Sequence, residues 1–356
     1  MLPLLLLLSL PQEAEPIEGG AQDAPSISTE ALIEVGLPLE RSRADLLPPA
    51  GALGRGWMMR KGELAFTVEQ NTSTFKGMRD GTRQVDVRDL DSNWTQSRRA
   101  TRSRWSLEGF YGWQNNVTLR AALPIETRSM NWSHDSVQGR TVNHGIGDVE
   151  LAADFRLLET LDHRLVIGTG VLAPTGEADA QGSWPGANPT PPTVEVLLPY
   201  WLQLGSGVWQ GLVNASWVHA RGDSGWGAGL RGTVPLEDSE SNWIRERALL
   251  ADAWLAQSLK SGWIGSVRLQ ASGWSDVRRA SDDSAGAMAT DPLLDNARQG
   301  GNRLDASVGL AVDLSPPATG LTNRLEFSVG TPLWEDLDGP GPAAELHFAF
   351  RWRATL

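Results

Sequence analysis

The stretch from Gly145 to Glu177 reads GIGDVELAADFRLLETLDHRLVIGTGVLAPTGE, and it predicts two strands joined by a tight turn. Apolar and polar residues alternate from Val149 to Leu157, and a second alternating run follows from Leu165 to Ala173. Successive side chains of a strand point to opposite faces, so the first run has one apolar face and one charged face. Thr160 to His163 forms the turn. A tilted strand of about ten residues spans the hydrocarbon core of a bilayer.

The rest of the chain repeats this unit, in about thirteen alternating runs altogether. The other runs are Glu63–Phe75, Trp105–Trp113, Val117–Glu126, Val194–Leu204, Trp209–Trp217, Trp226–Leu236, Leu249–Leu259, Trp263–Ala271, Leu304–Leu314, Leu325–Leu333 and Leu346–Trp352. Polar stretches predict long loops at Asp86–Arg104, Asn131–His144, Ala178–Pro192, Glu237–Asn242 and Asp276–Asn302. Single-chain bacterial barrels usually have an even number of strands, so we expect 12 or 14.

The pattern favours an all-β, membrane-spanning, antiparallel up-and-down β-barrel over a soluble β-sandwich. The runs are long, whereas strands of globular proteins have a mode of about 5–6 residues. Short turns alternate with long polar loops, as expected for the two sides of a membrane. The faces opposite the apolar ones carry many charges, which are costly in a dry core and natural in a watery lumen.

These charged faces supply the candidate functional residues. They would face the lumen and set an electrostatic field that biases permeation. An equally open interpretation is that they only pair with one another. The candidates are Asp148, Glu150, Asp154, Arg156, Arg120, Glu126, Arg268, Arg324 and Glu326.

Tryptophan is abundant, with 16 residues against 7 Phe and 2 Tyr. Aromatic side chains at strand ends are typical of the two membrane interfaces. We therefore expect interfacial positions for several of them, with ordinary core packing as the alternative. The candidates are Trp113, Trp209, Trp217, Trp263 and Trp334.

The N-terminal region differs from the rest. Leu4 to Leu8 resembles the apolar core of a secretory signal, so residues 1–14 are read as a weak signal peptide. Residues 15–60 are acidic at first and aperiodic, which predicts a flexible arm or a plug that enters the lumen. Residues 61–356 form the predicted barrel.

Composition excludes several classes of function. The chain has no Cys, so it has no disulfide, thiolate nucleophile or Cys-bound metal. Its net charge of -12 argues against nucleic-acid binding. None of the five His residues, His134, His144, His163, His219 and His347, lies in a recognisable nucleophile setting, so we expect no enzyme activity. We also expect no cofactor and no metal site.

Several short motifs resemble those of the outer-membrane transporter-like family linked to the meta-pathway of phenol degradation. They are Lys61–Glu63, Met78–Thr82, Gly145–Asp148 with Leu151 and Phe155, Gly168–Gly176, Leu198–Tyr200, Gln203–Gly207 with Trp209, Gly330–Leu333 and Asp336–Pro340. They cover the chain from about Gly51 to its end. The sequence departs from the family at Arg55–Arg60, where members often carry His and acidic residues.

This resemblance implies a barrel in the bacterial outer membrane and the passage of small compounds, hydrophobic or aromatic ones included. Our hypothesis is therefore a passive outer-membrane channel or transporter whose partners are lipid and a small-molecule permeant. Two alternatives stay open: a structural or adhesive surface barrel that conducts nothing, and a soluble secreted β-sandwich that binds a ligand. The sequence leaves the oligomeric state undefined.

Overall fold

The computed structural model describes residues 48–53, 57–86, 95–134, 137–185, 193–237, 244–245, 247–259, 262–278, 293–295, 298–314 and 322–356. The predicted signal peptide and most of the predicted arm lie outside these residues. No helix within the described ranges is long and apolar enough to cross a membrane. One 3₁₀ turn, η3 (Tyr200–Leu202), lies within them.

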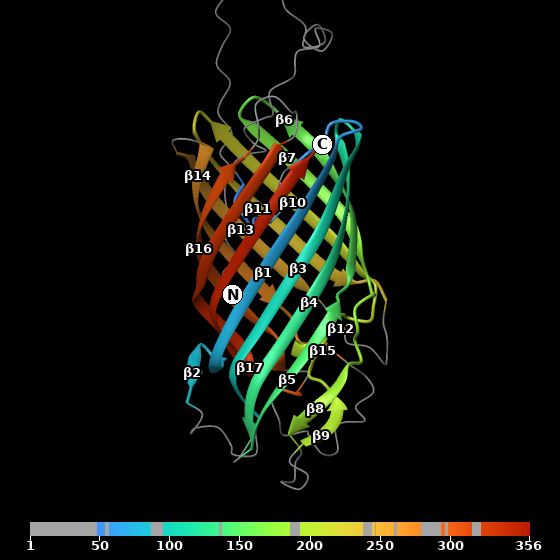
Figure 1. Ribbon diagram of the computed structural model, residues 1–356, viewed down its shortest axis with the longest axis vertical. Helices are drawn as coiled ribbons and strands as arrows, with labels where there is room; N and C mark the ends of the chain where they lie inside the picture. Colours follow the sequence, from blue (N-terminus) through green and yellow to red (C-terminus); the bar gives the residue numbers. More distant parts are fainter. Residues whose placement is uncertain are drawn as a thin grey trace, which may run out of the picture. The chain divides into compact units, whose positions relative to one another are not determined.

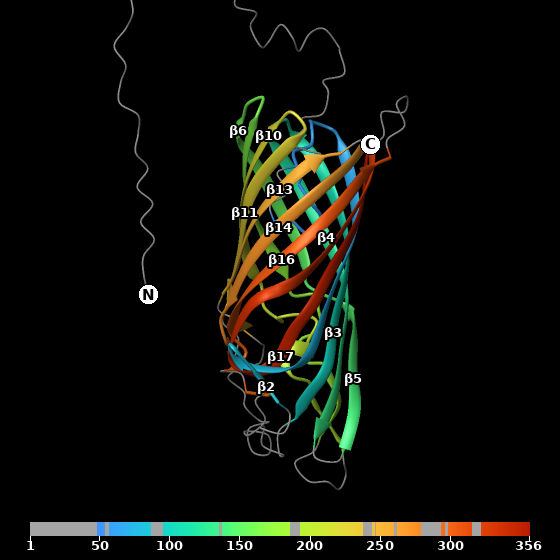
Figure 2. The same ribbon diagram turned by 90° about the vertical axis from the view of Figure 1, so that its left-hand side faces the viewer.

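A single antiparallel sheet closes on itself (Figures 1 and 2). Closure comes from pairing of the first wall strand with the last, which removes the free edges of the sheet. The predicted all-β barrel is confirmed, and the β-sandwich alternative is wrong, because there is one closed sheet. The wall strands are β1 (Leu64–Gly81), β3 (Gln96–Gln114), β4 (Val117–His134), β6 (Val149–Glu159), β7 (His163–Ala173), β10 (Gln210–Arg221), β11 (Ser224–Pro235), β13 (Ala248–Ser258), β14 (Trp263–Trp274), β16 (Gly301–Asp313) and β17 (Thr322–Thr355).

Strand β17, of 34 residues, crosses the wall twice. Its first part, to Leu337, pairs with β16, and the part from Leu337 onward pairs with β1. The hydroxyl of Thr331 donates to the carbonyl of Glu345 at 3.1 Å, and the Phe327 and Phe350 rings lie 5.0 Å apart. The element is therefore a hairpin. With its two arms, the eleven wall elements make twelve crossings, one of the two even numbers expected.

The two ends of the barrel differ. At the short-turn end, β3 leads to β4 through Gln114–Val117, β10 leads to β11 through Arg221–Ser224, and the amide of Leu356 donates to the carbonyl of Leu64 at 2.8 Å. At the long-loop end, the figures show the small elements β2 (Arg83–Val85), β5 (Val137–Ile146), β8 (Gln181–Pro185) and β9 (Thr193–Leu197). Strand β5 pairs with β4, and β8 pairs with β9 in a separate sheet. The two-residue strands β12 (Ile244–Arg245) and β15 (Val277–Arg278) pair with each other.

Four predicted segments need correction. Residues 96–104, expected in a loop, belong to β3, and most of the loop expected at Asn131–His144 belongs to β4 and β5. The expected strand Val194–Leu204 is not part of the wall: it contains β9, a bend and η3. Strand β8 lies inside the loop expected at Ala178–Pro192.

The wall exposes apolar side chains on its outer face and buries charged side chains on its inner face, which is the reverse of a soluble protein. On β6, Leu151 and Phe155 are 48% and 36% exposed on the outside, whereas Glu150 and Asp154 on the inner face are 2% and 9% exposed. In water such an apolar exterior would be costly, but lipid tails cover it at no cost. The described barrel is therefore built for a membrane, with a polar interior.

At the long-loop end the interior changes character. An apolar cluster lies there, built from the ends of β1, β3 and β4, from the connection between β7 and β10, and from Leu293. The connection contributes Trp184, Leu198 and Leu202, all 2% exposed or less. The side chain of Gln203 stabilises the fold of this connection by forming hydrogen bonds with the backbone of Ala180 and Leu198. We call this cluster, with β8, β9 and η3, the cap.

Candidate functional site

A cavity of about 570 Å³ lies inside the barrel. Inward side chains of the wall line most of it. The remainder comes from an N-terminal segment at Gly51–Leu53 and Trp57, and from Tyr200 and residues 203–206 next to the cap. A cavity of this size accommodates a small organic molecule. The lining is rich in charged side chains.

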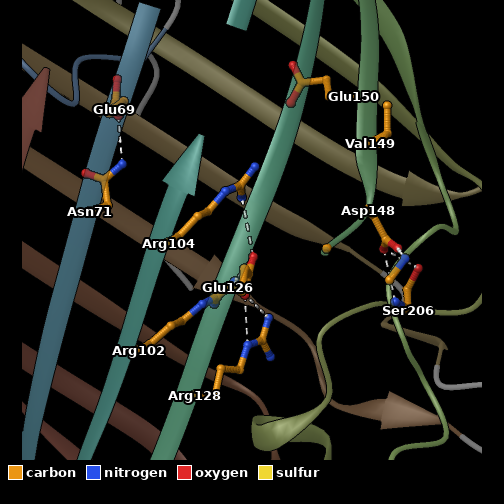
Figure 3. A network of polar contacts seen from close by, with 12 residues as sticks. Glu69, Asn71, Arg102, Arg104, Glu126, Arg128, Asp148, Val149, Glu150 and Ser206 are labelled. Carbon is orange, nitrogen blue, oxygen red and sulfur yellow. Dashed lines mark hydrogen bonds and ion pairs between the residues drawn. The ribbon is translucent and has the colours of Figure 1, made fainter. Parts of the chain in front are cut away.

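Glu126 on β4 forms ion pairs with three arginines (Figure 3). Its carboxylate lies 2.7 Å from the guanidinium of Arg128, 3.3 Å from that of Arg102 and 3.9 Å from that of Arg104. Glu126 is 3% exposed, so its charge depends on these partners. All four side chains line the cavity. This part of the wall thus carries a local surplus of positive charge.

Glu150 on β6 centres a second cluster. It forms ion pairs with Arg120 of β4 and with Arg231 of β11, the latter at 2.6 Å. Arg120 also lies 3.5 Å from Asp154, which accepts a hydrogen bond from Asn214 at 3.3 Å. Two arginines face two carboxylates here, so the cluster is balanced. It ties together four strands that are distant in sequence.

A third set of charges joins β1 to β17. The guanidinium of Arg351 lies 2.7 Å from Glu69 and 3.0 Å from Glu326, and Glu326 lies 2.8 Å from Arg324. Arg351, Glu326 and Arg324 are at most 2% exposed. Arg324 and Glu326 do not line the main cavity but lie beside Pro49 and Ala50. These two predicted residues therefore act in the closing seam of the wall.

The N-terminal segment, residues 48–53 and 57–60, lies inside the barrel. The amide of Met59 donates to the Thr118 hydroxyl at 2.9 Å, and the amide of Leu53 donates to Asp252 at 2.7 Å. Arg268 donates to the carbonyl of Gly51, so this predicted cavity residue holds the segment as well. The ring of Trp57 stacks under Arg353, whose Cζ lies 4.0 Å from the ring centroid.

Two wall glycines leave room for this segment. A Cβ on Gly229 of β11 would overlap the carbonyl oxygen of Leu53, and one on Gly112 of β3 would overlap that of Arg60. The wall and the segment are therefore fitted to each other at backbone distance.

Asp148 lies in the bend between β5 and β6 and faces away from the arginines (Figure 3). It accepts hydrogen bonds from the Gly176 amide at 3.1 Å and from the amide and hydroxyl of Ser206, both at 3.0 Å. Burial raises the pKa of its carboxyl group, although these hydrogen bonds favour the charged form. Asp148 thus fastens both ends of the connection that carries the cap. Motifs that the family resemblance named separately meet at this carboxylate.

The remaining predicted residues lie at the surface or the rim. Arg156 pairs with Glu159 near the short-turn end. Trp113, Trp209, Trp263 and Trp334 are 40–58% exposed on the outer face, and Trp217 is half-buried against Trp226 and His163. His347, by contrast, lines the cavity and lies 4.0 Å from Asp305. Within the described ranges, no three His, Cys, Asp or Glu side chains gather in a way that could hold a metal ion.

Sequence reasoning missed Arg102, Arg104, Arg128 and Arg231. Arg102 and Arg104 belong to the part of β3 that was expected to be a loop. The period of two does continue there, through Arg102, Arg104, Ser106 and Glu108, but the residues between them are not all apolar. Extending the inward face of the strand would have found both arginines.

Comparison with solved structures supports the fold. The chain is similar to the COG4313 outer membrane channel from Pseudomonas putida F1, with a TM-score of 0.61 and 14% identity over 85% of this chain and 98% of that one. A Pseudomonas aeruginosa FadL homologue matches with a TM-score of 0.41 and 9% identity, over 83% and 90% of the two chains. The Pseudomonas putida toluene transporter TodX matches with 0.39 and 8%, over 83% and 89%.

Only the first of these scores exceeds 0.5, and it bears on the fold alone. No protein-family model matches the chain, and no curated protein matches it. The fold is that of a bacterial outer-membrane β-barrel.

Proposed function

We propose that the protein is an outer-membrane channel that lets small molecules pass through the barrel without an energy source of its own. The observation that supports this best is the charged cavity enclosed by a wall whose outside is apolar. A barrel that served only as a surface scaffold could fill its lumen with packed side chains. Here the lumen holds a space of about 570 Å³ lined by paired charges, which is the environment that a hydrated solute needs.

The N-terminal segment is proposed to act as a plug. Residues 48–53 and 57–60 occupy lumen space and are held by Asp252, Arg268 and Thr118. The segment also packs apolar side chains against the wall, since Trp57 and Met59 cluster with Ala65 and Phe110, so it moves only when these contacts open together with the hydrogen bonds. A permeant would pass once this segment moves, with the cap controlling the opposite end.

The family resemblance points to compounds related to phenol degradation as permeants, and a link of the channel to that pathway is part of this proposal. The polar lining adds a requirement: an aromatic permeant that passes here should also carry a polar or charged group, because an apolar molecule gains little from arginine and carboxylate side chains. Catalysis is not part of the proposed role.

Single-channel recording in planar bilayers tests the proposal. The purified chain should give discrete conductance steps. The variant Gly229→Ala, whose added methyl group overlaps Leu53, should dislodge the plug and enlarge the steps. Gly232→Ala on the same strand is the matched control, since its methyl group would meet neighbouring atoms only at ordinary distances of 3.5 Å or more.

The outcomes separate the alternatives. Larger steps for Gly229→Ala with unchanged steps for Gly232→Ala support a plugged channel. Steps of equal size in all three proteins would contradict the plug. A lack of steps at any voltage in all three, from protein that migrates as a folded barrel, would favour the non-conducting surface barrel.

A further inference from the structure

The charge around the cavity is not evenly paired. Arg102, Arg104 and Arg128 share Glu126 as their ion-pair partner within the described residues. The adjacent cluster is balanced, with Arg120 and Arg231 facing Glu150 and Asp154. Arg104 also interacts electrostatically with Glu150, so the two clusters form one continuous patch. Five guanidinium groups face three carboxylates in this patch, which leaves two positive charges over.

Asp148, the next carboxylate along the wall, does little to cancel this surplus. Its two oxygens accept the three hydrogen bonds from Gly176 and Ser206. Figure 3 shows its side chain turned toward Ser206 and the three arginines turned toward Glu126. The surplus is therefore concentrated at Arg102 and Arg104.

These two arginines hold Glu126 loosely. Charge-assisted hydrogen bonds of this kind are usually about 2.7–2.9 Å long. Arg128 meets that distance, at 2.7 Å, but Arg102 lies 3.3–3.4 Å from the carboxylate oxygens and Arg104 lies 3.9 Å away, beyond hydrogen-bond range. Their side chains are 45% and 33% exposed, whereas that of Arg128 is 10% exposed. Both line the cavity, so their donors are accessible to a molecule inside it.

The neighbouring groups suit an anion with an apolar body. Tyr200, which interacts electrostatically with Arg102 and Arg128, lines the same cavity and offers a hydroxyl donor and a ring. Leu204 adds apolar lining. Planar guanidinium groups match the geometry of a carboxylate and can bind it through two parallel hydrogen bonds.

From this geometry we infer that Arg102 and Arg104, with Tyr200, form a binding site for a small organic carboxylate inside the barrel. This deepens the proposed channel function by naming the class of permeant, and it rests on that function only for transport, not for binding. The carboxylate of the ligand takes the donors that Glu126 leaves unused. Glu126 acts as a competing anion that keeps the patch folded when the site is empty.

Binding of benzoate and of its neutral analogue benzamide to the detergent-purified full chain, measured by titration calorimetry, tests this inference. The two ligands have nearly the same shape and differ in charge. Benzoate should bind at least about 10-fold more tightly than benzamide, given the usual strength of charge-assisted hydrogen bonds. The double variant Arg102→Gln/Arg104→Gln should remove this difference. Arg140→Gln, which deletes an exposed arginine on β5, is the matched control and should leave it unchanged.

Glu126→Gln gives a result in the opposite direction. Removing the competing carboxylate should tighten benzoate binding, whereas a merely structural role for Glu126 predicts weaker binding in this variant too. If Glu126→Gln does not fold, as judged by migration on a gel before and after boiling, the arginine variants still decide the question.

Equal binding of benzoate and benzamide to the unmodified chain would overturn the inference, and so would full benzoate binding by the folded double variant. Failure of this site and failure of the channel proposal are distinguishable. Benzoate selectivity in a protein that gives no conductance steps would keep the site and refute the channel. Conductance without benzoate selectivity would keep the channel and refute the site.

Discussion

The two halves of the barrel place their apolar side chains on opposite faces of the wall. Strand β4 runs through both halves and shows the change. Toward the short-turn end its outward residues are Leu119, Leu123 and Ile125, and its inward residues are Arg120 and Glu126. Toward the long-loop end the same outward face carries Thr127, Ser129 and Asn131, and the inward face carries Met130 and Trp132. The apolar side of one strand thus changes from outside to inside within a few residues.

The difference follows from what surrounds each half. Where lipid lies outside, apolar side chains face outward and the charges face the lumen. Where water lies outside, the strand behaves like one in a soluble protein, and its apolar residues turn inward to the cap. From this change of side we infer that β4 leaves the bilayer between Ile125 and Met130.

The largest loss of stability is expected from a truncation in the apolar cluster of the water-surrounded half. Trp184→Ala removes a fully buried side chain whose ring lies 6.2 Å from that of Trp132. Such truncations cost about 3–5 kcal/mol. The cap should loosen and become sensitive to protease between β7 and β10, while the closed wall stays folded.

Leu151→Ala is the control for this substitution, because lipid fills the space that it leaves on the outer face. It should leave the protease pattern unchanged. Resistance of the Trp184→Ala cap to protease would show that the apolar cluster does not hold it.

A charge placed on the outer face should cost much more stability in the lipid-facing half than in the water-facing half. Leu123→Lys puts an ammonium group into the lipid-facing half and should destabilise the barrel by about 2–4 kcal/mol. Ser129→Lys, on the same face of the same strand, should change stability by about 0.5 kcal/mol or less. Denaturant unfolding in lipid vesicles measures both, and equal costs would contradict the proposed position of the membrane boundary.

The smallest effect concerns the junction between the halves. Asp148→Asn replaces charge-assisted hydrogen bonds to Gly176 and Ser206 by weaker ones, and it should cost about 1.5–3 kcal/mol. Protease should then cut the connection faster than in the unmodified chain. Asp179→Asn, an exposed position in the same connection, is the control and should have no effect. Equal cleavage rates in both variants would show that Asp148 does not fasten the cap.

The change of the apolar side from the outer to the inner face also explains which strands could be predicted from the sequence. Alternation of apolar and polar residues is visible only where the outer face meets lipid, and there the predicted strands agree with the wall. The sequence predicts loops at residues 96–104 and 131–144 because both faces of those strand regions contain polar residues. Val194–Leu204 does alternate, but Val196, Leu198 and Leu202 pack in the cap and not against lipid.

The inward positions of Arg120, Glu126 and Glu150 followed from the period of two, whereas the ion pairs that these residues form did not. Arg231 reaches Glu150 across 81 residues of sequence, and that meeting depends on how the sheet closes. Periodicity assigns a side chain to a face of its strand, but strand order decides which charges share that face.

The seam between β1 and β17 also has a consequence for folding. It pairs Ala65 with Thr355, so the barrel closes through contacts between residues almost 300 positions apart, and such contacts carry the largest loop-closure entropy in the chain. We therefore expect hairpins such as β10–β11, which are joined by a two-residue turn, to form first and the seam to form last. The N-terminal segment immediately precedes β1 and lies within the closed wall. The final step of assembly therefore both completes the membrane wall and encloses the segment that fills it.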